Sequence, residues 1–200
     1  MKLFLVNRGL TTLDGIDLTG VTHLYCSHNQ LTSLPPLPET LEKLHCYVNQ
    51  LTSLPPLPET LEKLDCSNNQ LTSLPPLPET LQELICTNNQ LTSLPPLPET
   101  LEILYCSGNY LKSLPPLPET LEILSYFNNY ITLFPDLPWG LRNYWEKEKL
   151  EQHNKRLKDL QMETVETLPD KETWDQINEM WIHWQYRIGG EKYIEATLSF

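Results

Sequence analysis

The chain repeats a 20-residue unit in one unbroken register, and this periodicity constrains its fold more than any other feature. The segment LTSLPPLPET recurs unchanged at 31–40, 51–60, 71–80 and 91–100. A leucine column holds Leu24, Leu44, Leu64, Leu84, Leu104 and Leu124. Two residues later stand Cys26, Cys46, Cys66, Cys86 and Cys106, with Tyr126 in the sixth copy. A third column holds Asn29, Asn49, Asn69, Asn89, Asn109 and Asn129. A fixed period of this length predicts a solenoid of stacked units.

The stretch LEKLDCSNN predicts a β-strand in each unit. Leu64 and Cys66 are two residues apart and point to one face, whereas Lys63 and Asp65 point to the other. Parallel strands of successive units stack about 4.8 Å apart, so each column becomes a ladder. We expect buried leucine and thiol ladders and an open outer face. Buried amides need partners, so the asparagines are expected to bond the turn backbone of their own unit and the next.

The stretch LPPLPET predicts the opposite side of each unit. Its three prolines lack backbone donors and fix φ, which favours extended polyproline II geometry over helix. Leu51, Leu54 and Leu57, spaced by three, are expected to face inward in this conformation.

The pattern L-x-x-L-x-C-x-x-N-x-L has the spacing of leucine-rich repeats. The unit LPPLPETLEKLDCSNNQL resembles the shortest of these repeats, those of bacterial type III secreted effectors and of giant DNA virus proteins. The inward cysteine in LHCYVNQL and LYCSGNYL is more similar to the viral members. The resemblance covers about residues 21–141 and implies a leucine-rich repeat solenoid with a parallel β-sheet on its concave face. Several such effectors carry a ubiquitin ligase domain with a catalytic cysteine, but residues 141–200 contain no cysteine, so we predict no enzyme.

We predict three parts in the chain: an N-terminal capping rung at 1–20, six 20-residue repeats at 21–140, and an α-helical C-terminal tail at 141–200. The tail carries an apolar stripe at helical spacing, formed by Trp174, Ile177, Trp181, Trp184 and Ile188. Three uses of the tail remain open: capping the last rung, folding over the concave face, and forming a homodimer or docking a partner.

The net charge of −12 limits the classes of partner. Residues 1–140 hold 5 Lys and Arg against 14 Asp and Glu, so the repeats carry most of it. An acidic surface repels phosphate backbones, which disfavours nucleic acid. No stretch reaches the roughly 18 apolar residues of a membrane span, and the apolar run from Leu3 to Val6 is too short for a signal peptide. We predict a cytoplasmic protein, with the cytoplasm of a host cell included. Glutamate recurs at one position of successive repeats, at 39, 59, 79, 99 and 119. We interpret this column either as a means of keeping the protein soluble or as the contact for a basic partner.

The cysteines and histidines predict no metal, cofactor or catalytic centre. Five thiols in one file do not converge on a tetrahedral point, and an odd number without a secretory signal disfavours disulfides. His45 stands one rung from Tyr25 and Asp65, close enough for a hydrogen bond. No motif of a known catalytic class accompanies it.

Differences among the copies fall on the outward strand positions, while the exposed convex positions of the five copies from 31 to 120 differ only at Lys112. Drift of exposed residues would not spare the convex side, so we favour selection for a binding face. The predicted partner-binding residues are Tyr25, Lys43, His45, Tyr47, Lys63, Asp65, Ile85, Ile103, Tyr105, Ile123 and Phe127. Tyr105 and Phe127 are expected to be the anchors, because aromatic side chains dominate interface energies, and Lys43, Lys63 and Asp65 are expected to set orientation.

The sequence thus predicts a non-enzymatic module that binds a protein partner on its concave β-face. Two alternatives remain: a structural or assembly protein that self-associates through its C-terminal helices, and a host-directed, effector-like adaptor.

Overall fold

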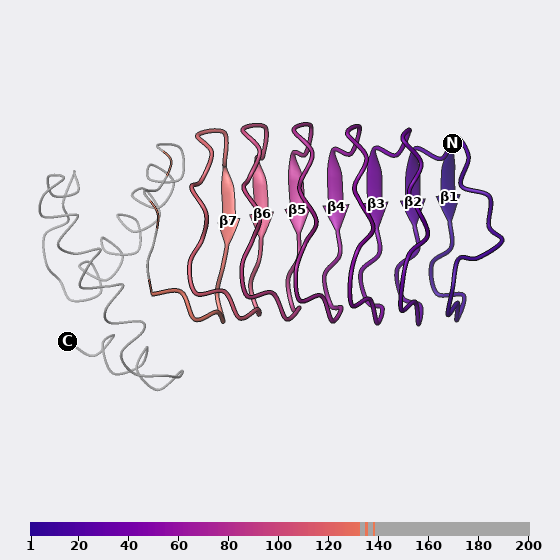
Figure 1. The fold of residues 1–200 in the computed structure, drawn as a ribbon, viewed down its shortest axis with the longest axis horizontal. Helices are drawn as coiled ribbons and strands as arrows, with labels where there is room; N and C mark the ends of the chain where they lie inside the picture. Colours follow the sequence, from indigo (N-terminus) through magenta and orange to yellow (C-terminus); the bar gives the residue numbers. More distant parts are fainter. Residues whose placement is uncertain (133–134, 136–137, 139–200) are drawn as a thin grey trace, which may run out of the picture. The chain divides into compact units, whose positions relative to one another are not determined.

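Seven short parallel strands form one sheet, with strand order identical to chain order (Figure 1). The structure is a computed structural model that describes residues 1–132, 135 and 138. The strands are β1 (Lys2–Phe4), β2 (His23–Tyr25), β3 (Lys43–His45), β4 (Lys63–Asp65), β5 (Glu83–Ile85), β6 (Ile103–Tyr105) and β7 (Ile123–Ser125). The predicted helical tail at 141–200, with its tryptophan stripe, lies outside the described residues.

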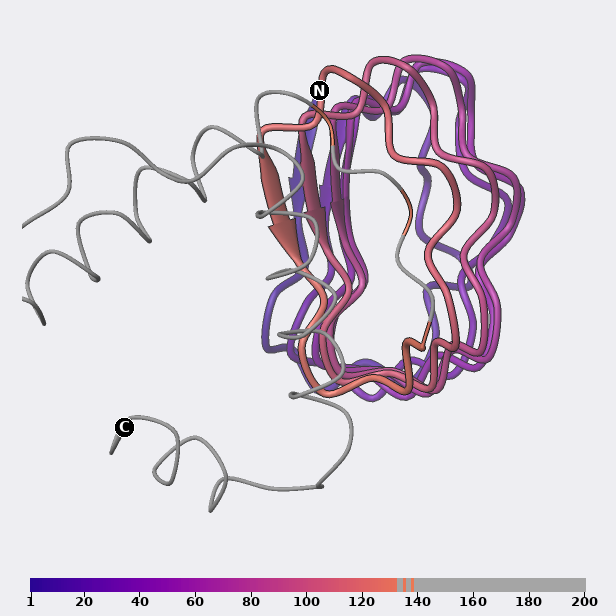
Figure 2. The same cartoon turned by 90° about the vertical axis from the view of Figure 1, so that its left-hand side faces the viewer.

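The strands stack in a register that follows the sequence period. Leu44 lies opposite Leu64, and Leu64 lies opposite Leu84. Residues 1–20 add a strand of their own, since Leu3 of β1 pairs with Leu24 of β2. Viewed along the stack, the strands form one wall and the extended segments form the opposite wall (Figure 2). The predicted leucine-rich repeat solenoid, with its parallel sheet, is therefore confirmed.

The interior is built from the two predicted ladders. The central leucines of β2 to β7 and all five cysteines are buried, and the thiols are free. Burial raises the pKa of Cys26 and of Cys106 to about 12, because a thiolate loses its hydration there. Burial raises the pKa of the three middle thiols as well. These cysteines act as small apolar core residues.

The asparagine column ties each rung to the one before it. Asn69 Nδ2 donates to the carbonyls of Cys46 and Cys66 at 3.1 and 3.0 Å, and Asn69 Oδ1 accepts from the Leu51 N–H at 3.0 Å. The expected ladder is confirmed, but its direction was wrong. The amide bonds its own rung and the preceding rung, because the turn carbonyls and N–H groups that remain unpaired belong to that earlier rung.

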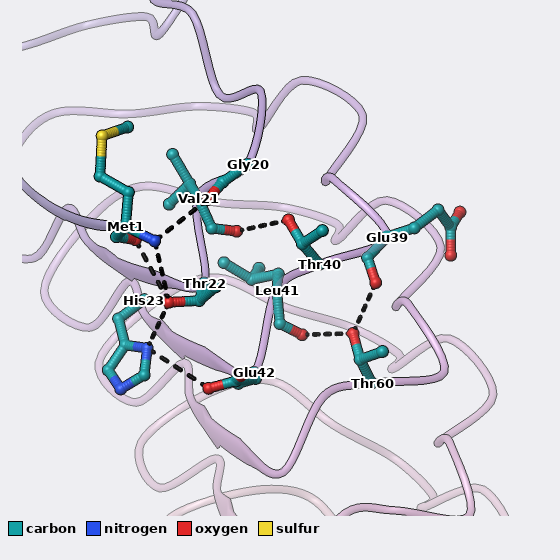
Figure 3. Close-up of polar contacts among 10 residues, drawn as sticks. All are labelled: Met1, Gly20, Val21, Thr22, His23, Glu39, Thr40, Leu41, Glu42 and Thr60. Atoms are coloured by element: carbon teal, nitrogen blue, oxygen red, sulfur yellow. Dashed lines mark hydrogen bonds and ion pairs between the residues drawn. The ribbon is translucent and has the colours of Figure 1, made fainter.

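A threonine column forms a second set of ties, on the convex side of the turn (Figure 3). Thr60 Oγ1 donates to the carbonyls of Glu39 and Leu41, both at 2.8 Å. Equivalent bonds come from Thr40, Thr80, Thr100 and Thr120. At the N-terminal end, the ammonium of Met1 donates to the Gly20 carbonyl at 3.1 Å. The constancy of this exposed threonine therefore has a structural cause.

The convex wall is extended, and residues 1–132 contain no helix. Leu51 and Leu54 are buried as predicted, whereas Leu57 is half-exposed and Pro58 is buried in its place. The expected inward position of Leu57 was therefore wrong. The Leu61 N–H donates to the Pro58 carbonyl at 3.1 Å, which closes a β-turn. This turn directs the chain back to the sheet and brings the proline ring inside.

Candidate protein-binding face

The outward residues of the strands and the residues that follow them form one continuous surface, called the concave face below. Of the predicted site residues, nine are half-buried there: Tyr25, Lys43, His45, Tyr47, Lys63, Asp65, Ile85, Ile103 and Tyr105. Two are more open, Ile123 with 41% and Phe127 with 49% of the side chain exposed. The nine of these residues that lie in strands share this face, because alternate residues of each strand point to opposite sides, whereas Tyr47 and Phe127 stand two residues beyond the ends of β3 and β7.

The C-terminal half of the concave face is apolar. The register places Ile103 opposite Ile123, and Ile85 opposite Tyr105. Phe127 stacks on the buried ring of Tyr126, with centroids 5.3 Å apart. We call Ile85, Ile103, Tyr105, Ile123 and Phe127 the apolar patch. Exposed apolar clusters of this kind mark interaction sites more often than single exposed residues do.

The N-terminal half carries an aromatic stack. Phe4 stacks on Tyr25 with centroids 4.7 Å apart, and Tyr25 stacks on His45 at 4.9 Å. Both spacings match the distance between neighbouring strands. The stack was not predicted from the sequence, and Phe4, which is 57% exposed, was not among the predicted site residues. Aligning residues 2–4 with 23–25 reveals this position.

His45 is more buried than a surface histidine. Burial lowers its pKa below the ordinary value, although Asp65 and Glu83 act in the opposite direction. No hydrogen bond joins His45 to Asp65 among the described residues. The Asp65 carboxylate instead accepts from the Ser67 N–H at 3.1 Å and from the Ser67 hydroxyl at 2.7 Å. A short acidic side chain bonds the backbone two residues on more readily than a neighbouring strand.

The position before each asparagine belongs to a tight turn, not to a freely variable surface. Its backbone has positive φ in every repeat: His28, Val48, Asn68, Asn88, Gly108 and Asn128. Asparagine and glycine adopt this conformation at low cost. Gly108 has a second constraint, since a Cβ there would overlap the Asn88 carboxamide. The residue types found in this column are therefore explained by the backbone conformation of the turn. Val48, with φ of 54°, is the exception.

Two exposed tyrosines in the last two repeats were missing from the predicted site. Tyr110 and Tyr130 stack with centroids 6.0 Å apart, and 49% and 62% of their side chains are exposed. They stand at the position that glutamine holds at Gln30, Gln50, Gln70 and Gln90. The comparison among copies that identified the other residues could have identified these two.

The charged residues of the predicted site lie on the middle strands. Lys63 Nζ and Glu83 Oε2 form an ion pair at 2.8 Å, while Lys43 lies directly opposite Lys63. Within residues 1–132, 135 and 138, no group of three or more His, Cys, Asp or Glu could hold a metal ion. The same part of the chain has no helix able to cross a membrane.

Comparison with known proteins supports this description. The family model described as Leucine Rich repeats (2 copies) matches residues 39–79 and 79–119. No curated protein matches the sequence.

Solved structures similar to the chain include the LRR domains of bacterial effectors. A Shigella effector LRR domain is 40% identical with a TM-score of 0.61, and the alignment covers 67% of this chain and 61% of the other. YopM, a leucine-rich effector protein from Yersinia pestis, is 32% identical with a TM-score of 0.55 and coverages of 68% and 52%. YopM from Yersinia enterocolitica is 37% identical with a TM-score of 0.51 and coverages of 60% and 32%.

The chain thus spans less than two thirds of each of these structures. The repeats and the effector neighbours support a protein-interaction module. The described chain is a solenoid of leucine-rich repeats of about 20 residues.

Proposed function

We propose that the protein binds a protein partner on its concave face and is not an enzyme. The observation that carries this proposal is the apolar patch, in which Ile123 and Phe127 are exposed and the other three residues are half-buried on an otherwise acidic solenoid. Burying such side chains releases about 25 cal/mol for each Å² of apolar surface. Tyr105 and Phe127 are the proposed anchors, and Lys43, Lys63 and Asp65 orient the partner.

The variation among the repeat copies supports the proposal less strongly than the sequence alone suggested. The constant threonine of the convex side forms hydrogen bonds to the neighbouring rung. Its constancy therefore has a structural cause and is no evidence that the variable positions were selected for binding. The outward strand positions have no comparable backbone constraint. Their chemistry, and the position of the apolar patch, are therefore the better argument.

The experiment compares the full chain with the variant Tyr105→Asp/Phe127→Asp in binding to peptides selected from a random displayed library. The variant should bind at least about tenfold more weakly, because it buries two charges at the contact. The control is Thr52→Asp/Ser53→Asp, which adds the same charge at exposed convex positions. If both variants bind equally well, the apolar patch is not the interface.

An effector-like adaptor in a host cytoplasm is the form of this function that the structural neighbours favour, since their names describe effectors. It predicts that partners are captured from host-cell extract by the full chain and lost with Tyr105→Asp/Phe127→Asp. Capture that is unaffected by the variant would count against it.

Self-association through Trp174, Ile177, Trp181, Trp184 and Ile188 remains a prediction, since these residues lie outside the described part. Light scattering of the full chain and of Trp181→Asp/Trp184→Asp decides it. A dimer that dissociates in the variant supports self-association, and a monomer in both contradicts it.

A further inference from the structure

Three lysines and a histidine stand in one column of the concave face. Lys2, His23, Lys43 and Lys63 lie directly opposite one another on β1 to β4. Residues 1–138 contain only five Lys and Arg, and three of them stand in this column. We call these four residues the basic column. The basic column therefore concentrates positive charge within an acidic solenoid.

The fold does not require the basic column. Like charges directly opposite on neighbouring strands destabilise a sheet. Lys63 pairs with Glu83 at 2.8 Å, and the His23 ring lies 3.7 Å from Glu42. Within the described residues, the ammonium groups of Lys2 and Lys43 are in no ion pair. Two cations therefore remain available on this half of the face.

The aromatic stack beside the basic column has compatible electrostatics. Phe4, Tyr25 and His45 stack from strand to strand with interplanar angles of 4° and 11°. Their edges, not their faces, therefore point away from the sheet. Aromatic edges carry partial positive charge and attract carboxylate and carbonyl oxygens. Both outward columns of β1 to β3 thus favour an anionic ligand.

The same columns become apolar toward the C-terminal end. Glu83 follows Lys63, and then Ile103 and Ile123 occupy the position of the lysines. A ligand that crosses the sheet therefore meets cations first and isoleucines last. The four strands of the basic column span roughly 14 Å, which four or five residues of an extended chain cover.

We infer that the partner presents an extended segment that is acidic over β1 to β3 and apolar over β5 to β7. This inference rests on the proposed function of the concave face and adds the chemistry of its ligand. A nucleic acid fits less well, because residues 21–138 carry 3 Lys and Arg against 12 Asp and Glu, and would repel a dense polyanion.

The test uses the full chain, immobilised, and a random dodecapeptide library displayed on phage. Enriched peptides should carry Asp or Glu toward one end and apolar or aromatic residues toward the other. Their affinity should fall with rising salt, because exposed charges are screened. Lys43→Glu should weaken binding by about tenfold or more. The matched control is Lys112→Glu, an equal charge change at an exposed convex position, which should leave affinity within about twofold.

Three results would overturn the inference: enrichment of neutral or basic peptides, equal effects of the two lysine variants, or tight binding of an oligodeoxythymidylate that Lys43→Glu abolishes. The variant Tyr105→Asp/Phe127→Asp separates this failure from failure of the proposed function. If that variant loses the peptides while Lys43→Glu keeps them, the concave face binds proteins but not through acidic segments. If it keeps them, the proposed function and the inference both fail.

Discussion

Asn69 Oδ1 accepts a hydrogen bond from the Leu51 N–H, which belongs to the preceding rung and lies 3.0 Å away. The same side chain donates to carbonyls of both rungs. One amide thus satisfies three buried backbone groups that a tight turn would leave unpaired. Since Asn49 and Asn89 repeat these bonds, the column fixes the vertical register of the strands and so the positions of the concave face.

Replacing Asn69 should therefore destabilise the fold strongly. Asn69→Ala leaves the Leu51 N–H and two carbonyls without partners, and we expect a loss of about 3 kcal/mol in the free energy of unfolding. Urea denaturation followed by circular dichroism measures this loss. The control Gln70→Ala, at the exposed neighbouring position, should change stability by less than about 0.5 kcal/mol. Similar losses in the two variants would contradict the role of the amide.

Val48 should destabilise the protein relative to the residues that occupy the same turn position in other copies. Its φ of 54° is unfavourable for a β-branched side chain. Val48→Asn should raise the free energy of unfolding by about 1 kcal/mol, and the reciprocal Asn128→Val should lower it by a similar amount. Paired thermal and urea unfolding of both variants gives the answer. A neutral or destabilising Val48→Asn would show that the valine carries no strain.

Stability should depend on His45 through pH. Burial lowers the folded-state pKa of His45, so the unfolded chain binds its proton more tightly. The stabilising contribution is complete above the ordinary histidine pKa of about 6.5 and is lost as the pH falls from there toward the folded-state value. The free energy of unfolding should therefore fall more between about pH 7.5 and 5.5 in the native chain than in His45→Gln. Parallel pH dependences would refute this assignment.

The thiol ladder should be unreactive in the folded protein. All five cysteines are buried, and burial raises their pKa, so thiolates are scarce near neutral pH. A disulfide reagent at neutral pH should label none of the five rapidly, and all five once urea is added. Fast labelling of the middle thiols Cys46, Cys66 and Cys86 in native buffer would show that the core is open. That result would also remove the basis for assigning alternate residues to the concave face.

The sequence predicted the solenoid because the 20-residue period and the alternation along each strand apply equally to every repeat. Leu64 and Cys66 must share a face in any β-strand, and identical units must place them in ladders. The direction of the asparagine bonds was not predictable from this argument. It depends on which turn groups the sheet leaves unpaired, and only the stacked backbone determines that.

The candidate site was predicted in part, for physical reasons that differ between its halves. The apolar patch follows from residue type at outward positions, so the sequence could predict that Ile103 and Ile123 lie on the same face. Phe4 was missed because β1 lies 21 residues before β2 and lacks the proline motif. The tight turn at Val48 and Asn68 was not predicted, because positive φ depends on the backbone conformation of the stacked turn and not on residue type alone. The helical structure of the tail at 141–200 remains a prediction.

Covalent footprinting tests the central claim most directly. The full chain is treated with a side-chain labelling reagent, alone and with a selected peptide bound, and labelled residues are quantified by mass spectrometry. Protection should be confined to the concave face and strongest at Tyr105 and Phe127, while convex Leu57 and Leu77 keep their labelling. Protection of the convex leucines, with unchanged labelling of Tyr105 and Phe127, would contradict binding on the concave face.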